Sequence, residues 1–155
     1  YAHKMNVTKL IFISTIKVNG DITIKGESFK HDDEPNPSDA YAISKLKSEK
    51  SIIKISKLGK LNYTIIRPSL VYGKNVKGNL LKLLKIINLE LPLPFSSIKN
   101  QRSFLFIDNL IDFIILCLKN NNANNKTFLL SDSNAISTPN LMKIIALKLL
   151  FCQFL

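Results

Sequence analysis

A tyrosine and a lysine stand four residues apart in the segment Tyr41-Ala-Ile-Ser-Lys45. In a helix, residues at this spacing lie on the same face, one turn apart. A lysine ammonium beside a tyrosine hydroxyl favours the phenolate, which can accept a proton. Such a tyrosine can take the proton of a hydroxyl group while hydride leaves the same carbon, and the lysine can also bond to a ribose. The pair therefore predicts proton transfer coupled to hydride transfer, provided that the surrounding chain positions it.

Two apolar runs flank this pair and predict the strands that would position it. Residues 9–14 form the first run, and residues 63–67 form the second, which Pro68 closes. Both have the uninterrupted apolar character of strands buried on two faces, as in a parallel sheet. The first run leads into Ser14 and Thr15, whose hydroxyls would lie at the carboxyl end of a parallel strand. Open α/β sheets bind ligands at this edge.

Between the two runs the sequence predicts a helix from about Asp39 to Leu58. Pro35 and Pro37 precede it, Ser38 or Asp39 can cap its start, and Gly59 follows its end. Strand, helix and strand in this order predict a right-handed crossover unit, typical of doubly wound folds.

The second half of the chain changes character. Helical spacing of apolar residues predicts two helices, through Leu80, Leu83, Leu84 and Ile87 and through Leu110, Phe113, Ile114 and Cys117. Ser103 to Ile107 and Thr127 to Leu130 are expected to be strands, and Lys119 to Lys126, rich in asparagine, a loop. Thr138 is expected to cap a last helix, with Pro139 at its first position.

Four motifs in a fixed order carry a family resemblance. They are the strand ending in Ser14-Thr15, Tyr41-x-x-x-Lys45, Arg67-Pro68-Ser69-Leu70-Val71-Tyr72-Gly73, and Arg102-Ser103 followed after four residues by Asp108. From about residue 1 to 150 the sequence resembles the extended short-chain dehydrogenase/reductase superfamily. Within it the sequence is most similar to the UDP-glucose 4-epimerase-like enzymes of the NAD-dependent epimerase/dehydratase family and to nucleotide-sugar 4-keto reductases.

The resemblance implies an α/β fold. Residues 1–73 would be the C-terminal part of a Rossmann-like, doubly wound parallel sheet that binds NAD(P), and residues 74–155 a small α/β region that binds the nucleotide sugar. The five glycines, at 20, 26, 59, 73 and 78, make no Gly-x-x-Gly-x-x-Gly turn for a pyrophosphate. The chain also begins with Tyr1, so we expect an N-terminally truncated chain. It should expose apolar surface on its sheet, bind NAD poorly and be inactive alone.

The resemblance also implies roles for individual residues. Thr15, or its neighbour Ser14, matches the catalytic hydroxyl, Tyr41 the catalytic base, and Lys45 the lysine that holds the nicotinamide ribose. Pro68 lies in the segment expected against the nicotinamide ring. The nucleotide diphosphate would meet the helix start at Asn79 and Leu80 and the guanidinium of Arg102, while Phe95 would flank the uracil. We expect Asp108 to cap the following helix and Arg67 to be structural.

These roles imply epimerisation of a UDP-hexose at C4 through a transient 4-keto sugar, with NAD or NADP as cofactor and a homodimer through the Tyr41 helix. A 4-keto reductase would need the same residues and remains an alternative. A third interpretation, of another class, is a truncated and inactive remnant. A dehydratase is less consistent, because Thr15 is followed by Ile16 and Lys17 where those enzymes have an acid and a base.

Bulk composition excludes other classes. The formal net charge is +11, but the basic residues are scattered and not interleaved with aromatic ones, which argues against a specific nucleic-acid surface. His31-Asp32-Asp33-Glu34 precedes two prolines in a loop and is not expected to bind a metal. Cys117 and Cys152 form no metal or redox motif, and no apolar stretch reaches the roughly 20 residues of a membrane span. We therefore expect a cytoplasmic protein.

Overall fold

The computed structural model describes residues 7–24, 26–59, 61–74, 99–132 and 135–152. These fall into two compact units. The first consists of Tyr1–Ser69 and Asp108–Ser131, and the second of Leu70–Ile107 and Asp132–Leu155. The predicted helix through Leu80, Leu83, Leu84 and Ile87 lies outside the described residues.

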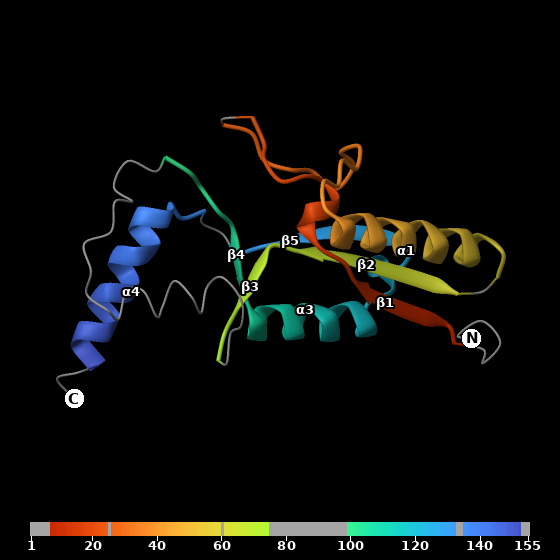
Figure 1. Ribbon diagram of the computed structural model, residues 1–155. Helices are drawn as coiled ribbons and strands as arrows, with labels where there is room; N and C mark the ends of the chain where they lie inside the picture. The colour runs from red at the N-terminus through yellow and green to blue at the C-terminus, as the bar shows by residue number, and fades with distance from the viewer. Residues whose placement is uncertain (1–6, 25, 60, 75–98, 133–134, 153–155) are drawn as a thin grey trace. The chain divides into compact units, whose positions relative to one another are not determined.

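A three-stranded parallel sheet forms the centre of the first unit (Figure 1). Its strands are β1 (Lys9–Ile13), β2 (Asn62–Pro68) and β5 (Lys126–Leu130), in the order β1-β2-β5. The middle strand, β2, is buried from Thr64 to Pro68, and Ile65 and Ile66 are fully buried. The apolar runs thus form the predicted parallel strands, because buried parallel strands are apolar on both faces.

The helix α1 (Ala40–Lys57) connects β1 to β2 and lies along one face of the sheet (Figure 1). Asp39 is its N-cap, with its carboxylate accepting a hydrogen bond of 2.7 Å from the backbone N–H of Ala42. Ser38, the alternative cap, instead donates its hydroxyl hydrogen to Asp21. The helix ends at Leu58, just before Gly59, as its sequence predicts.

The helix α3 (Ile107–Lys119) lies on the opposite face of this sheet (Figure 1). Leu110 and Cys117 are buried, and the ring of Phe113 meets Phe128 of β5 edge to face at a centroid distance of 5.4 Å. The predicted apolar face of this helix is therefore the one that contacts the sheet. Asp108 is the second residue of α3, within its first turn, so the prediction that it caps this helix was wrong. Helices on both faces of a parallel sheet make the doubly wound α/β arrangement.

The second unit contains β3 (Leu70–Tyr72) and β4 (Phe104–Phe106), which pair in parallel. The strand β4 is shorter than the predicted Ser103–Ile107, because Ile107 already begins α3. Gly73 allows a close approach here, since a Cβ atom at this position would lie 2.4 Å from Cγ2 of Ile107.

The last helix, α4 (Thr138–Cys152), also belongs to the second unit. The prediction that Thr138 caps it was wrong, because Thr138 is its first helical residue. The hydroxyl oxygen of Ser137 accepts a hydrogen bond from the N–H of Asn140 and supplies the cap. The hydroxyl and N–H of Thr138 both bond to the side chain of Asn100 instead. Within the described part of the chain, no helix has the length and apolar character needed to cross a membrane.

Candidate active site at the carboxyl ends of β1 and β2

Two hydroxyl side chains follow the carboxyl end of β1. Ser14 is 3% exposed, and its N–H donates a hydrogen bond of 2.7 Å to the carbonyl oxygen of Ile66 in β2. Its hydroxyl oxygen is buried and has no hydrogen-bond partner among the described residues. Thr15 is half-buried and caps the short 3₁₀ helix η1 (Ile16–Val18), its hydroxyl oxygen accepting from the N–H of Lys17 at 3.4 Å. Both hydroxyls thus lie at the sheet edge that the sequence predicts for them.

The Tyr41–Lys45 pair of α1 reaches the same end of β1. The Nζ atom of Lys45 donates a hydrogen bond of 2.9 Å to the carbonyl oxygen of Ile13, the residue before Ser14. The same ammonium lies 5.7 Å from the ring centroid of Tyr41 and 4.9 Å from that of Phe12. Both distances are within the range of cation–π attraction. Tyr41 itself is 56% exposed, so its hydroxyl is accessible to a ligand.

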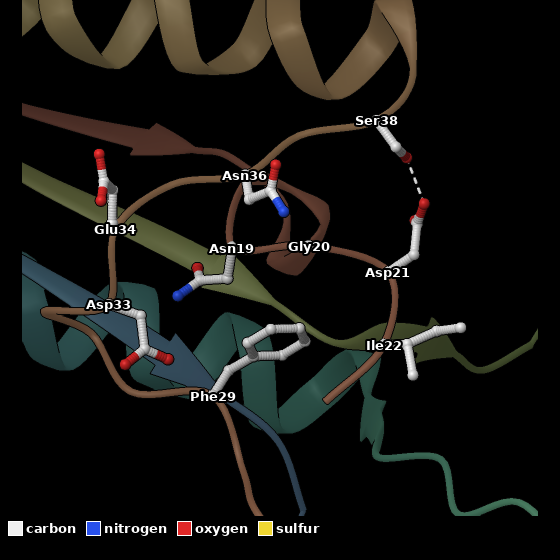
Figure 2. A pocket seen from close by; sticks show the side chains of 9 residues that line it. All are labelled: Asn19, Gly20, Asp21, Ile22, Phe29, Asp33, Glu34, Asn36 and Ser38. Carbon is white, nitrogen blue, oxygen red and sulfur yellow. Dashed lines mark hydrogen bonds between the residues drawn. The ribbon is translucent and has the colours of Figure 1, made fainter. Parts of the chain in front are cut away.

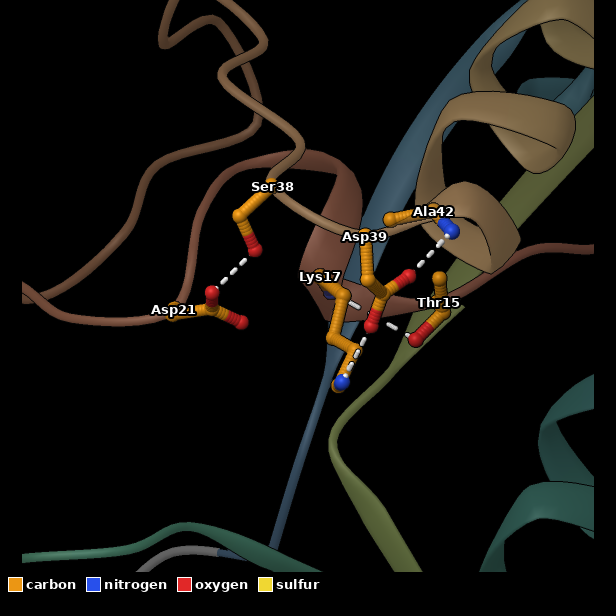
Figure 3. A network of polar contacts seen from close by, with 6 residues as sticks. All are labelled: Thr15, Lys17, Asp21, Ser38, Asp39 and Ala42. Carbon is orange, nitrogen blue, oxygen red and sulfur yellow. Dashed lines mark hydrogen bonds and ion pairs between the residues drawn. The ribbon is translucent and has the colours of Figure 1, made fainter.

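An exposed ion pair joins η1 to the start of α1 (Figure 3). The Nζ atom of Lys17 lies 2.5 Å from the carboxylate of Asp39, the N-cap of α1. Their hydrogen bond raises the pKa of Lys17 and lowers the pKa of Asp39. Because both side chains are largely in contact with solvent, screening makes this pair a weak contributor to stability.

A second ion pair, deeply buried, involves Arg67 near the end of β2. Its Nε and Nη2 atoms donate to the two carboxylate oxygens of Glu49 at 3.0 and 2.6 Å, and its Nη1 donates to the side-chain oxygen of Asn19 at 2.9 Å. Arg67, Glu49 and Asn19, all 5% exposed or less, form what we call the Arg67 network. The interpretation of Arg67 as structural is therefore confirmed.

Glu49 and Asn19 are not among the residues predicted from the sequence. Glu49 is the only acidic residue of α1 and stands four residues after Lys45, on the face of Tyr41 and Lys45. The signal that could have identified Glu49 is that it is the single acidic residue on the helix face that carries the candidate site. Asn19 carried no such signal, because its contact with Arg67 spans 48 residues of sequence.

Pro68 and Ser69 follow Arg67 at the same edge of the sheet. Pro68 is the last residue of β2, buried beside Leu130 of β5. The N–H of Ser69 donates to the carbonyl oxygen of Leu130 at 2.9 Å, whereas its buried hydroxyl oxygen has no partner in the part of the chain that the structure describes. The carboxyl ends of β1 and β2 thus carry the apolar ring of Pro68 and the buried hydroxyls of Ser14 and Ser69.

Of the residues expected to bind the nucleotide diphosphate and uracil, Arg102 is the one that the structure describes. Arg102 lies in the second unit, exposed, where its backbone forms an isolated antiparallel bridge with Ile136 at hydrogen-bond distances of 3.0 and 2.9 Å. Asn79, Leu80 and Phe95 lie outside the described residues. The structure therefore brings Ser14, Thr15, Tyr41, Lys45 and Pro68 together in one unit and describes Arg102 by itself.

A cavity of about 470 Å³ opens within the loop between η1 and α1 (Figure 2). Its lining is mainly polar and acidic and comprises Asn19, Gly20, Asp21, Ile22, Phe29, Asp33, Glu34, Asn36 and Ser38. None of the expected catalytic side chains lines it. Across residues 7–24, 26–59, 61–74, 99–132 and 135–152, no three His, Cys, Asp or Glu side chains gather into a group that could hold a metal ion.

The site offers partners for the ribose end of a nicotinamide cofactor. The ammonium of Lys45 is a donor at the sheet edge, and the hydroxyl of Ser14 has hydrogen-bonding capacity unused by the described residues. The sequence contains no glycine-rich turn for the pyrophosphate end of such a cofactor. The residues present therefore fit one end of the cofactor.

Parallel strands covered on both faces, with hydroxyl, phenol and ammonium groups at their carboxyl ends, define a Rossmann-like α/β protein. Residues 1–130 match the NAD dependent epimerase/dehydratase family. The sequence is 41% identical over 144 residues to a UDP-glucose 4-epimerase of Vibrio cholerae, covering 92% of this chain and 44% of that protein. The chain belongs to the NAD-dependent epimerase/dehydratase family.

Solved structures agree on the fold. A UDP-glucose 4-epimerase of Thermotoga maritima, solved with UDP-glucose, is 20% identical with a TM-score of 0.78, covering 93% of this chain and 48% of that one. A UDP-glucuronic acid 4-epimerase of Bacillus cereus, solved with NAD, is 23% identical with a TM-score of 0.82, covering 93% and 47%. The chain thus spans about half the length of the relatives it matches.

Proposed function

We propose that this chain carries the proton-transferring and sugar-binding part of a nucleotide-sugar 4-epimerase of the UDP-hexose type. The observation that carries the proposal is the ammonium of Lys45, bonded to Ile13 at the end of β1 and lying beside the ring of Tyr41. The 41% identity to a UDP-glucose 4-epimerase supports the choice of substrate class. In this proposal residues 1–73 serve the cofactor and residues 74–155 the nucleotide sugar.

The proposed chemistry begins with Tyr41 as its phenolate. It takes the proton from the 4-hydroxyl of the sugar, and the hydroxyl of Thr15 holds the same oxygen by a hydrogen bond. Bound NAD or NADP would supply the hydride chemistry at C4, removal from one face of the sugar and return to the other. Tyr41 then gives the proton back to the 4-oxygen, so protons and electrons balance over the cycle. Ser14 is the alternative hydroxyl for the role of Thr15.

The positive charge of Lys45 has two roles in this proposal. It stabilises the phenolate of Tyr41 through space, and it can donate a hydrogen bond to the ribose of the cofactor. Pro68 would form part of the surface against the nicotinamide ring. In the sugar-binding region, the guanidinium of Arg102 and the helix start at Asn79 and Leu80 would bind the diphosphate, and Phe95 would flank the uracil.

A fluorescence titration of the purified chain with NADH, in the presence and absence of a UDP-sugar, tests the proposal. Saturable binding that is lost in Lys45→Ala would support a working cofactor site. Absence of binding would favour the alternative of another class, a truncated and inactive remnant. A second close alternative, a nucleotide-sugar 4-keto reductase, would show net consumption of NADH with a 4-keto sugar, whereas an epimerase shows none over its full cycle.

We also propose that the chain forms a homodimer through α1. A shallow groove of about 700 Å³ runs along its outer face, lined by Ala40, Ile43, Ser44, Lys47, Ser48, Ser51 and Ile52. Small serine side chains along this groove would let a second helix approach closely. Sedimentation of the chain and of Ser44→Arg would test this, because the arginine should leave a monomer if the groove is the interface.

A further inference from the structure

The Arg67 network connects the two segments that carry the expected catalytic side chains. Glu49 lies on α1, two turns beyond Tyr41 and on the same face. Asn19 follows η1, the 3₁₀ turn that begins directly after Thr15. Arg67, on the middle strand, donates hydrogen bonds to both.

We propose, as an extension of the proposed function, that Arg67 is a positioning residue which fixes the Thr15 turn relative to the Tyr41–Lys45 face of α1. A guanidinium is planar and donates in fixed directions, so one side chain can hold two acceptors at a set separation. Its burial strengthens the effect, because little water competes for the three bonds.

The third hydrogen bond distinguishes the proposed positioning role from that of an ion pair that only stabilises the fold. Two bonds from Arg67 to Glu49 suffice to attach α1 to β2. The bond from Nη1 to Asn19 adds nothing to that attachment, but it reaches the segment that follows Thr15. Asn19 in turn donates its amide hydrogen to the carbonyl oxygen of Lys30 at 2.8 Å, so the network also holds the loop that leads to α1.

Two other side-chain connections between these segments, from Lys45 and from Lys17, are poorer positioning devices. Lys45 reaches only as far as Ile13, before the hydroxyl pair, through a flexible and half-buried side chain. The Lys17–Asp39 pair does reach η1, but it is exposed and therefore screened. The Arg67 network is the buried connection that extends beyond Thr15.

Two variants remove the Arg67–Asn19 bond from opposite ends. Asn19→Ala deletes the acceptor and leaves the pair with Glu49. Arg67→Lys keeps a positive charge for Glu49, and leaves the bond from Asn19 to Lys30, but lacks the third directed donor. Ile65→Val is the matched control, because Ile65 is a fully buried residue of the same strand outside the network.

The measurement is amide hydrogen exchange by NMR on the full chain without ligand, together with the signals of the Thr15 methyl group and the Tyr41 ring. The amides of Val18 and Asn19, bonded to Thr15 and Ile16, report on η1, and that of Ser14, bonded to Ile66, reports on the sheet. Both network variants should raise exchange at Val18 and Asn19 about fivefold more than at Ser14, as expected for losing one buried hydrogen bond. The Thr15 and Tyr41 signals should shift in both.

The control should raise exchange at all three amides by one common factor and leave the Thr15 and Tyr41 signals in place. If the two network variants behave like Ile65→Val, Arg67 serves folding alone and the proposal is overturned. An effect in Asn19→Ala that Arg67→Lys does not share would assign it to the Lys30 contact and would also overturn the proposal. Since no ligand is used, a failed NADH titration would reject the proposed function without deciding this result.

Discussion

Among the described residues, two ion pairs connect α1 to the rest of the first unit, and they differ chiefly in burial. Glu49 and Arg67 have side chains that are 2% and 6% exposed, share two hydrogen bonds and lie in the middle of the fold. Lys17 and Asp39 have side chains that are 49% and 39% exposed and share one contact at the helix start. Charge and separation are similar, so burial is the variable that distinguishes them.

The difference shows how the helix can be held at its middle and accessible at its start. The buried pair fixes the middle of α1 on the sheet, where an unpaired charge would be costly. In the first turn Ala42 is buried, but Tyr41 is 56% exposed and can meet a ligand. This arrangement separates the buried pair that holds α1 on the sheet from the exposed Tyr41, which we propose as the base.

The largest effect is expected from Glu49→Ala, which leaves the guanidinium of Arg67 buried without its carboxylate. The free energy of unfolding should fall by about 3–5 kcal/mol, as for other broken buried pairs. Urea denaturation followed by circular dichroism measures it. The double variant Glu49→Met with Arg67→Met removes both charges and should be clearly more stable than the single variant. A loss no larger than that of a surface change would mean that the two pairs do not differ as burial implies.

An intermediate effect is expected from Lys45→Met, which removes the hydrogen bond to Ile13 but keeps the aliphatic stem. Stability should fall by about 1 kcal/mol, the usual net value of such a bond. NADH binding, where the parent chain shows it, should be lost. Lys50→Met, an exposed residue of the same helix outside the groove, is the control and should retain both properties. Retained NADH binding in Lys45→Met would remove Lys45 from the site.

A smaller, pH-dependent effect is expected for the exposed pair. The pKa of Asp39 is lowered from 3.8, so its contribution exists above that pH and is lost as the pH falls through the folded value. The pKa of Lys17 is raised from 10.5, so its contribution exists below that pH and is lost as the pH rises further. The stability difference between the parent and Lys17→Met should therefore be small at neutral pH, fade as the pH falls below 3.8, and vanish once the pH lies below the folded pKa of Asp39. A difference that persists in strong acid would contradict the ion-pair explanation.

The smallest effect on stability is expected from Tyr41→Phe, because the side chain is 56% exposed. Its free energy of unfolding should stay within about 0.5 kcal/mol of the parent value, as for most surface changes. Any sugar-nucleotide epimerisation by the protein that contains this chain should be abolished, since the proton acceptor is gone. Urea denaturation measures the free energy of unfolding, and an assay of UDP-sugar interconversion measures the activity. Full activity in this variant would exclude Tyr41 as the base.

Local sequence predicted the elements of the first unit well. The apolar runs that became β1 and β2 are continuous, and Pro35, Pro37, Asp39 and Gly59 bracket α1. These signals act over a few residues, through backbone preference and burial, so they can be read directly. The helix caps were harder, because neighbouring polar residues compete for the same role. The side chain of Thr138 bonds to Asn100, and the hydroxyl of Ser137 caps α4 in its place.

The sequence by itself determined the order of the motifs, the apolar strand segments and the shared helix face of Tyr41 and Lys45, because each can be inferred from the pattern within one segment. Tertiary structure alone decided that Lys45 bonds to the end of β1, that Glu49 is buried, and that Asn19 meets Arg67. These contacts join residues 18 to 48 positions apart, and their geometry depends on how α1 lies across the sheet. A charged residue at a helical position of the sequence can be solvated or buried. Only the packing of the folded chain distinguishes the buried Glu49 from the solvated Asp39.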